Sequence, residues 1–307
     1  MGMKERLRKA LTHIKRGLTS LFVCAAVILP AATMVEWSHA FGSEPKATVQ
    51  DTRTTNPLPK MNVRAIDATS TPPNLFGEPL ITVTFDDGWE SVYTQAMPLL
   101  NKYGIPTTQY IIAGVSHDFN YLSDFQVREI LRTGHELDSH TYTHADLPTK
   151  NDKDLKHELL DSQKNMQSRF GAKMFDDLAS PYGHTDDRVM ALLQTIYRSH
   201  RNTDGDYSNG IGEFDVNVAG NFDRYNIIGV TIRHDTTVDD LRRLVEYTIA
   251  NNGWLVLTYH AVDDEESAFA VDASLMDAQL KYLASVQSRL VTMGQVLDTI
   301  APTHLEY

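Results

Sequence analysis

Apolar and polar positions divide the chain into three parts. An apolar run from Leu18 to Val35 follows a basic segment, and residues 41–79 then show no apolar periodicity. From Leu80 onward, short apolar runs alternate with helical patterns. The apolar runs have the length of strands and lie at 81–87, 106–113, 135–141, 177–183, 197–203, 227–233 and 254–260. This alternation predicts a parallel βα architecture.

Seven strands that alternate with helices predict a single α/β catalytic domain at residues 80–302. We expect a distorted (β/α)7-type barrel, irregular or incompletely closed, with an open doubly wound sheet as the alternative. No glycine-rich loop for a phosphate follows the first strand, where Asp86-Asp-Gly88 stands instead. Among the helix signals, Ser123-Asp-Phe-Gln126 forms a capping box and predicts the start of a helix.

The first 40 residues have the pattern of an export segment. A basic head precedes the apolar run, and Ser38-His-Ala40 offers small residues where a signal peptidase reads. Pro30 favours a cleaved signal peptide, and a retained signal anchor is the alternative. Residues 41–79 are rich in Thr, Pro, Asn and Ser and predict a disordered linker. We therefore expect a secreted, periplasmic or cell-envelope protein that contacts a membrane only through an uncleaved anchor.

Charge and cysteine content narrow the possible partners. The chain has 28 Lys and Arg against 40 Asp and Glu, a formal net charge of −12 at pH 7. An acidic surface argues against nucleic acid or an anionic bilayer as a partner. The single cysteine, Cys24, lies in the apolar run, so a mature chain would have no disulfide.

Reactive side chains stand where four of the predicted strands end. They are Asp86 and Asp87 at the first strand, His140 and His144 after the third, Pro181-Tyr-Gly183 at the fourth and His260 at the seventh. The carboxyl ends of parallel strands meet at one face of a barrel or sheet. We therefore expect these side chains to gather at that face.

The spacing of His140 and His144 predicts a metal site. We expect the two imidazoles to lie on one face of a helical turn, where both could bind the same metal ion. Two imidazoles and a carboxylate suit Zn²⁺ or another divalent transition metal such as Co²⁺. Asp86 and Asp87 could supply the third ligand and a general base, and Gly88 permits the turn that lets both face the site. The pattern predicts a metal-dependent hydrolase.

Four motifs resemble those of the polysaccharide deacetylases (carbohydrate esterase family 4, or NodB-homology domains). Thr84-Phe-Asp-Asp-Gly88 and His140-Thr-Tyr-Thr-His144 resemble the first two, Ser180-Pro-Tyr-Gly183 the third and Leu255-Val-Leu-Thr-Tyr-His260 the last. The resemblance spans about residues 80–300. It implies a distorted barrel, a divalent metal, usually zinc, and hydrolysis of N-acetyl groups on sugar polymers.

The resemblance also implies roles for single residues. By motif position, Asp87, His140 and His144 bind the metal, Asp86 is the base and His260 is the acid that protonates the leaving amine.

Further positions are expected to serve the substrate. The backbone N–H of Tyr182 would help hold the oxyanion. Trp89 could line a sugar subsite or simply pack, and we place Pro181 and Arg201 with Trp89 as candidate substrate-binding residues.

The chain departs from the family pattern at three places. Ala179 stands where the family usually has an arginine that orients the base, and Arg201 on the following strand is a candidate to reach in. Thr258 replaces a leucine of the acetyl pocket. The Asp-Trp pair that tunes the acid histidine is not recognisable, and Asp235 is its nearest candidate. Similar gaps are typical of a subgroup that resembles exopolysaccharide deacetylases, so we interpret the site as a variant.

The leading hypothesis is a hydrolase that removes N-acetyl groups from the N-acetylhexosamine units of a polysaccharide. One alternative keeps the fold and the metal but acts on a small amide or a cyclic imide. The other is a catalytically impaired module that binds a glycan.

Overall fold

The computed structural model describes residues 78–115, 118–171, 175–203, 216–218, 222–263, 267–286 and 288–300. The export segment predicted at residues 1–40 lies outside these ranges, as does the linker predicted at 41–79 up to residue 77. Among the residues described, no helix is both long enough and apolar enough to cross a membrane.

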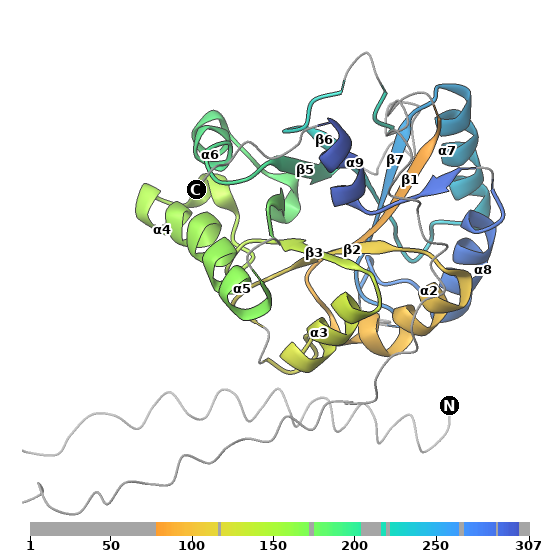
Figure 1. Ribbon diagram of the computed structural model, residues 1–307, viewed down its shortest axis with the longest axis horizontal. Coiled ribbons are helices and arrows are strands. Elements are labelled where there is room, and N and C mark those ends of the chain that lie inside the picture. The colour runs from red at the N-terminus through yellow and green to blue at the C-terminus, as the bar shows by residue number, and fades with distance from the viewer. Residues whose placement is uncertain are drawn as a thin grey trace, which may run out of the picture. The chain divides into compact units, whose positions relative to one another are not determined.

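In the described part of the chain, seven parallel strands close into a barrel (Figure 1). They are β1 (Leu80–Phe85), β2 (Thr107–Ile111), β3 (Glu136–Ser139), β4 (Asp177–Ala179), β5 (Ser199–Thr203), β6 (Ile227–Thr231) and β7 (Trp254–Tyr259). Each pairs with the next, and β1 pairs with both β2 and β7. This closure confirms the predicted (β/α)7-type barrel and shows that the doubly wound alternative is wrong.

An eighth strand, β8 (Arg289–Leu290), was not predicted. It pairs with Leu80 and Ile81 at the start of β1, whereas β2 pairs with β1 from Val83 onward. One edge of β1 is therefore shared between β8 and β2, while its other edge pairs with β7 along its whole length.

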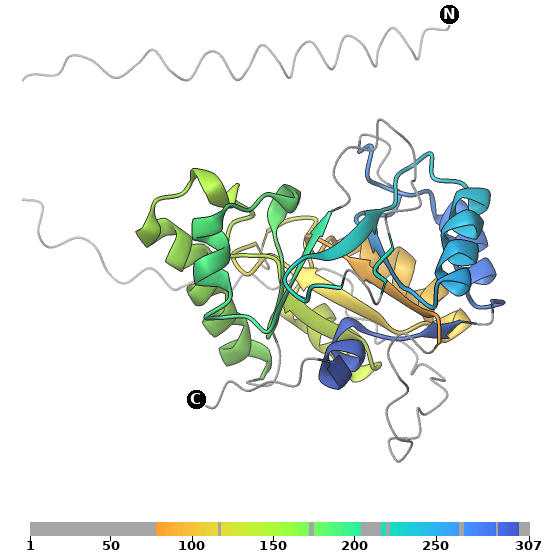
Figure 2. The same cartoon turned by 90° about the horizontal axis from the view of Figure 1, so that it is seen from above.

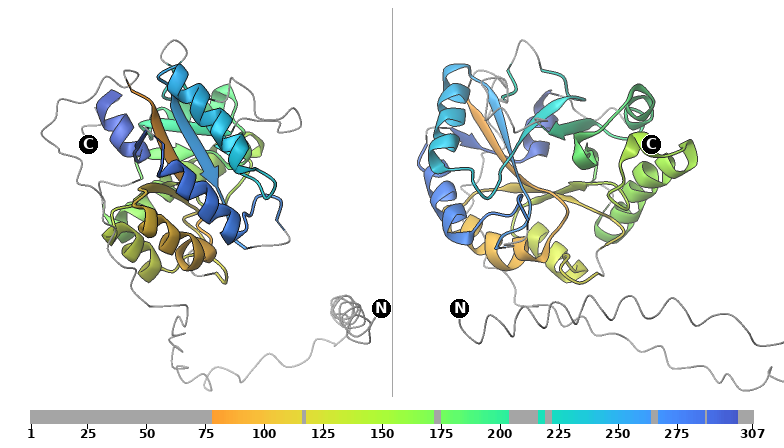
Figure 3. Two further views of the ribbon diagram at one scale, coloured as in Figure 1. Left: turned by 90° about the vertical axis from the view of Figure 1, so that its right-hand side faces the viewer. Right: turned by 180° about the vertical axis from the view of Figure 1, so that it is seen from behind.

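Helices cover the outside of the strands (Figure 3). The longer ones are α2 (Met97–Tyr103), α3 (Asp124–Arg132), α4 (Asp152–Lys156), α5 (Ser162–Phe170), α6 (Asp187–Leu193), α7 (Val238–Ala250), α8 (Ala273–Leu283) and α9 (Met293–Ile300). Short helical segments are η1 (Val92–Ala96), η2 (Leu147–Thr149), η3 (His157–Asp161) and η4 (Pro181–Gly183). The predicted capping box begins α3, where the N–H of Ser123 donates to the side chain of Gln126 at 2.8 Å.

Helix α9 lies at the end of the barrel where the strands begin (Figure 2). The N–H of Met293 donates to the hydroxyl of Thr108 at 2.9 Å, and the N–H of Gly294 donates to Glu136 at 2.8 Å. A Cβ on Gly294 would lie 1.8 Å from an oxygen of Glu136, so any larger residue there would force this carboxylate to move. With one end covered, the carboxyl ends of the strands are left for the site.

Alternation along the strands separates an apolar layer from a polar interior. In β1, Ile81, Val83 and Phe85 belong to the large apolar core. The alternate residues of the same strand make hydrogen bonds across the sheet: Thr82 accepts from the indole of Trp254 at 2.9 Å, and Thr84 donates to Thr258 at 3.2 Å. The next position in this second series is Asp86, which is how the strand carries a carboxylate to the carboxyl end of the interior.

Candidate active site

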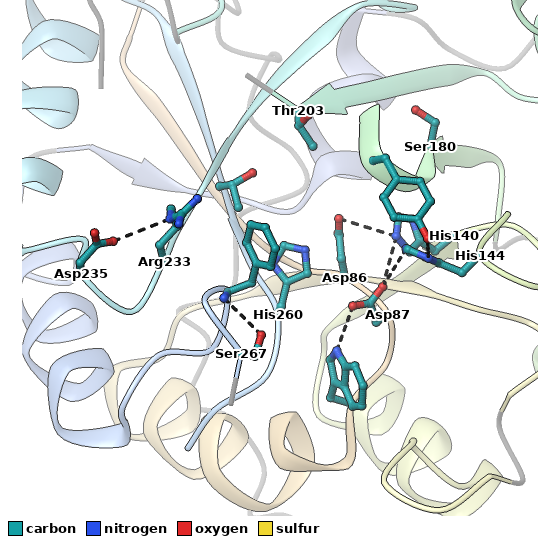
Figure 4. Close-up of a pocket in the computed structure, with 14 residues that line it drawn as sticks. Asp86, Asp87, His140, His144, Ser180, Thr203, Arg233, Asp235, His260 and Ser267 are labelled. Atoms are coloured by element: carbon teal, nitrogen blue, oxygen red, sulfur yellow. Dashed lines mark hydrogen bonds and ion pairs between the residues drawn. The ribbon is translucent and has the colours of Figure 1, made fainter. Parts of the chain in front are cut away.

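A pocket of about 810 Å³ opens at the carboxyl ends of the strands (Figure 4). Seven of the nine predicted site residues line it: Asp86, Asp87, Trp89, His140, His144, Tyr182 and His260. The other two, Pro181 and Arg201, are buried and do not line it. Residues from four strand ends thus come together as the sequence predicted.

The turn after β1 brings both carboxylates to the pocket. Asp87 has φ 71° and Gly88 has φ 81°, so the chain leaves the extended conformation directly after Asp86. The N–H of Gly88 donates to the carbonyl of Asp86 at 2.9 Å and closes this turn. Asp86, in the extended register of the strand, and Asp87, in the turn, can therefore serve one site, as predicted from Gly88.

The two histidines lie on a loop after β3, so the predicted helical turn is wrong. Thr141 and His144 have φ values of 68° and 61°, in the left-handed region. The N–H groups of Tyr142 and Thr143 donate to the carboxylate of Glu158 at 3.1 and 2.8 Å. The loop thus satisfies its backbone through a distant side chain where a helix would use its own carbonyls. Sequence spacing alone gives no signal for Glu158.

The imidazoles converge on one oxygen of Asp87. The Nε2 atoms of His140 and His144 lie 3.4 and 3.2 Å from Oδ1 of Asp87. Nδ1 of His140 lies 2.8 Å from the carbonyl oxygen of Ala179, which can only accept. Nδ1 therefore carries the proton in the neutral ring, and Nε2 presents a lone pair toward the carboxylate.

This arrangement fits a divalent cation. Ligand atoms of Asp87, His140 and His144 all lie within 4.8 Å of one another. A lone pair that faces a carboxylate is repulsive unless a cation stands between them. Burial alone would raise the pKa of Asp87, but the close approach of the two histidines holds the pKa well below its ordinary value. The donor set of two imidazoles and one carboxylate is one that zinc and similar metals accept.

Asp86 is held by a buried arginine. Nη2 of Arg201 donates to Oδ2 of Asp86 at 2.5 Å, and Arg201 is 0% exposed. The substrate contact predicted for Arg201 is therefore wrong, because its side chain lies behind Asp86 and does not reach the pocket. Its other predicted role, reaching in to orient Asp86, agrees with this geometry.

Gly229 makes room for the arginine. A Cβ on this residue would lie 2.9 Å from Cδ of Arg201 and 2.9 Å from the hydroxyl oxygen of Thr258. The path from β5 to Asp86 is open only because β6 carries no side chain at that position. The sequence pattern predicts no role for Gly229, because only the packing of three strands brings it against Arg201 and Thr258.

His260 directly follows β7 and lines the pocket. Within the described residues, Nδ1 of His260 has no hydrogen-bond partner. The ring of Phe269 lies 5.4 Å from its ring. Burial lowers the pKa of His260, although the negative charges of Asp86 and Asp87 oppose this. Asp235, the residue that sequence suggested as its partner, forms an ion pair with Arg233 at 3.8 Å.

The remaining candidates take up distinct positions. Trp89 donates its indole N–H to Oδ2 of Asp87 at 2.9 Å, so it contacts a candidate ligand directly. Tyr182 is 57% exposed, has φ 61° and places its hydroxyl 3.2 Å from Nδ1 of His144. In the turn at Pro181, the N–H of Gly183 donates to the carbonyl of Ser180 and the N–H of His184 donates to the carbonyl of Pro181. The N–H of Tyr182 takes no part in these two hydrogen bonds.

A family model described as polysaccharide deacetylase matches residues 75–197. Over these residues the chain is similar to the polysaccharide deacetylase family. This agrees with the resemblance predicted from the motifs. The matched segment contains the candidate metal ligands, Asp86 and the turn at Tyr182, while Arg201 and His260 lie beyond it.

Curated relatives are similar to this chain over part of their length. The chain is 28% identical over 115 residues to a chitooligosaccharide deacetylase of Sinorhizobium fredii, covering 37% of the chain and 52% of that protein. It is 30% identical over 138 residues to a peptidoglycan-N-acetylglucosamine deacetylase of Bacillus cereus, covering 43% of the chain and 62% of that protein. The chain thus spans about half the length of the curated relatives it matches.

A solved structure supports the fold over a longer range. The Xyl-CE4 domain of a multidomain xylanase from the hindgut metagenome of Trinervitermes trinervoides superposes with a TM-score of 0.50. The two are 18% identical, and the match covers 73% of this chain and 91% of that one. The likeness therefore extends the shared barrel beyond the segment that the family model matches.

Proposed function

We propose that this chain is a metal-dependent hydrolase that removes N-acetyl groups from the N-acetylhexosamine units of a polysaccharide. The observation that carries the proposal is the convergence of Asp87, His140 and His144 beside the arginine-held Asp86. The names of the relatives, which are deacetylases of chitooligosaccharides and of peptidoglycan N-acetylglucosamine, support this substrate class.

Asp87, His140 and His144 would hold the cation, Zn²⁺ or another divalent transition metal such as Co²⁺. Such an ion polarises a carbonyl oxygen and lowers the pKa of a water molecule when it is bound. Asp86 would take the proton of the attacking water as general base. Within the described residues, Oδ1 of Asp86 has no hydrogen-bond partner, which leaves it for this proton while Arg201 holds Oδ2.

His260 would protonate the nitrogen of the acetamide as its carbon–nitrogen bond breaks. The oxygen of the water remains with the acetyl carbon, so the products are acetate and a free amine on the sugar. The backbone N–H of Tyr182 would stabilise the negative charge that develops on the carbonyl oxygen. The position of His260 in the lining of the same pocket as Asp86 supports a role in proton transfer.

The pocket suits part of a polymer. Aromatic rings of Tyr182 and Phe269 line it and are 57% and 45% exposed, as rings that pack on sugars would be. The export segment predicted from the sequence supports a secreted, periplasmic or cell-envelope location, where such polymers occur. We propose no nucleic acid as a partner, and membrane contact only through an uncleaved anchor.

The test is acetate release from N-acetylglucosamine oligomers and from a panel of N-acetylated glycans, with and without a chelator. We expect release that the chelator stops and that Asp86→Asn abolishes while metal binding persists. Asp235→Asn is the matched control, because Asp235 lines the pocket but pairs with Arg233. Metal-replete protein that is inert on every glycan contradicts the proposal, and turnover of small amides alone favours the alternative substrate class.

A further inference from the structure

The two carboxylate oxygens of Asp87 have different surroundings. Oδ1 faces the Nε2 atoms of His140 and His144 at 3.4 and 3.2 Å (Figure 4). Oδ2 accepts a hydrogen bond from the indole N–H of Trp89 at 2.9 Å. One oxygen is therefore directed to the candidate metal site, and the other is already occupied by a protein donor.

Trp89 is itself fixed by the loop that follows β2. Its ring stacks on that of Tyr121, with centroids 4.7 Å apart and an interplanar angle of 20°. Backbone hydrogen bonds join the two segments on either side: Glu90 donates to the carbonyl of Asn120 at 2.7 Å, and Leu122 donates to that of Gly88 at 2.8 Å. The indole is thus held between a second loop and the carboxylate.

An indole N–H can only donate, and a carboxylate is its strongest kind of acceptor. We propose that Trp89 is a positioning residue that holds Asp87 with Oδ1 toward the imidazoles and thereby raises the affinity for the metal. The inference rests on the proposed metal-dependent function and deepens it. Partners of metal ligands commonly contribute about 10- to 100-fold to metal affinity. The sugar contact that the sequence suggested for Trp89 would use the part of the indole that contacts neither Tyr121 nor Asp87.

Two variants separate the hydrogen bond from the ring. Trp89→Phe keeps an aromatic ring for Tyr121 and removes the donor. Trp89→Gln removes the ring but places an amide N–H the same number of bonds from Cα as the indole nitrogen. Zinc and cobalt affinities are measured on the full chain without substrate, by competition with a chromophoric chelator. Thermal unfolding in excess chelator reports the stability of each metal-free variant.

We expect zinc affinity to fall about 10-fold or more in Trp89→Phe and to be at least partly restored in Trp89→Gln. Wild-type affinity in Trp89→Phe overturns the inference, and so does an affinity in Trp89→Gln as low as that in Trp89→Phe. If only Trp89→Gln folds, an affinity near that of the wild type supports the hydrogen bond, and a 10-fold loss rejects it. Failure of the proposed function is distinct, because it appears in the wild type as absent metal binding or absent acetate release.

Discussion

Arg201 and Ala179 are register partners on the adjacent strands β5 and β4. The family resemblance places an arginine at position 179, and this chain has one at the paired position of the next strand. Register partners on neighbouring strands face the same side of the sheet. An arginine at position 201 of β5 therefore lies in the barrel interior, as an arginine at position 179 of β4 would. Its guanidinium reaches Asp86 across the interior at 2.5 Å. A residue that is missing from the sequence motif is thus supplied from another strand.

Replacing Arg201 with methionine tests this relationship, since methionine keeps most of the length and removes the charge. We expect the acetate-release rate to fall roughly 100-fold, because Asp86 loses the group that orients it. Removing one partner of a buried ion pair also destabilises a fold by about 3 to 5 kcal/mol. Denaturant unfolding measures that loss. Arg233→Met is the control, because its partly exposed pair with Asp235 contributes about 1 kcal/mol or less.

Gly229→Ala should displace Arg201 without touching Asp86. The added methyl group would lie 2.9 Å from Cδ of Arg201, so the side chain or β6 must shift. We expect a loss of about 1 to 3 kcal/mol in the free energy of unfolding, with a drop in turnover and unchanged zinc affinity. In an Arg201→Ala background the same substitution should cost less, because only the contact with Thr258 remains. Equal costs in both backgrounds would show that Arg201 is not what Gly229 accommodates.

Removal of the metal should leave the barrel folded. The strand pairs and the apolar core include none of the three ligands, so the site is preformed and metal binding adds to stability by simple linkage. Zinc at 100 times its Kd contributes about 2.7 kcal/mol, which should raise the melting temperature by a few to about ten degrees. Asp87→Asn should abolish this rise. Complete unfolding of the wild type by chelator at room temperature would contradict a preformed site.

Stability should fall in mild acid through a buried histidine. Burial lowers the pKa of His135 from 6.5 to about 4, and its Nδ1 lies 2.7 Å from the hydroxyl of Thr107. Below pH 6.5 the unfolded chain takes up a proton that the folded chain refuses until about pH 4. The unfolding free energy should therefore drop by about 2 kcal/mol at pH 5 relative to pH 8 from this residue alone.

His135→Gln isolates this contribution. The difference in unfolding free energy between pH 8 and pH 5 should be smaller in the variant than in the wild type by about the same 2 kcal/mol. His200, whose pKa burial also lowers to about 4, remains in both proteins and cancels in the comparison. An identical pH dependence in the two proteins would mean that His135 is protonated in the folded state.

Much of the barrel could be predicted because its strands have a clear apolar pattern in the local sequence. The residues of β1 and β7 are fully apolar or β-branched, and all their side chains are buried, so their sequence alone indicates interior strands. Strand β8 could not be predicted in this way. It has two residues, one of them Arg289, and only its place beside Leu80 makes it a strand.

The candidate site also has parts that the local sequence predicts and parts that depend on distant residues. Asp86, His140 and His260 could be predicted because each lies at the end of a predicted strand, and the topology of a parallel barrel brings strand ends together. The conformation of the histidine loop could not, since it depends on the carboxylate of Glu158 from another segment. The contact between Arg201 and Asp86 spans 115 residues and depends on which strands become neighbours.

The pairing of β1 with β7 also bears on when the candidate site is assembled. Thr84 and Thr258 share a hydrogen bond although 174 residues separate them, and contacts across such distances form late and slowly. The three candidate metal ligands follow β1 and β3, whereas His260 follows β7, the strand that closes the barrel by pairing with β1. In a growing polypeptide the three candidate ligands are consequently synthesised before His260. The candidate site is thus complete only after the last barrel strand has paired with the first.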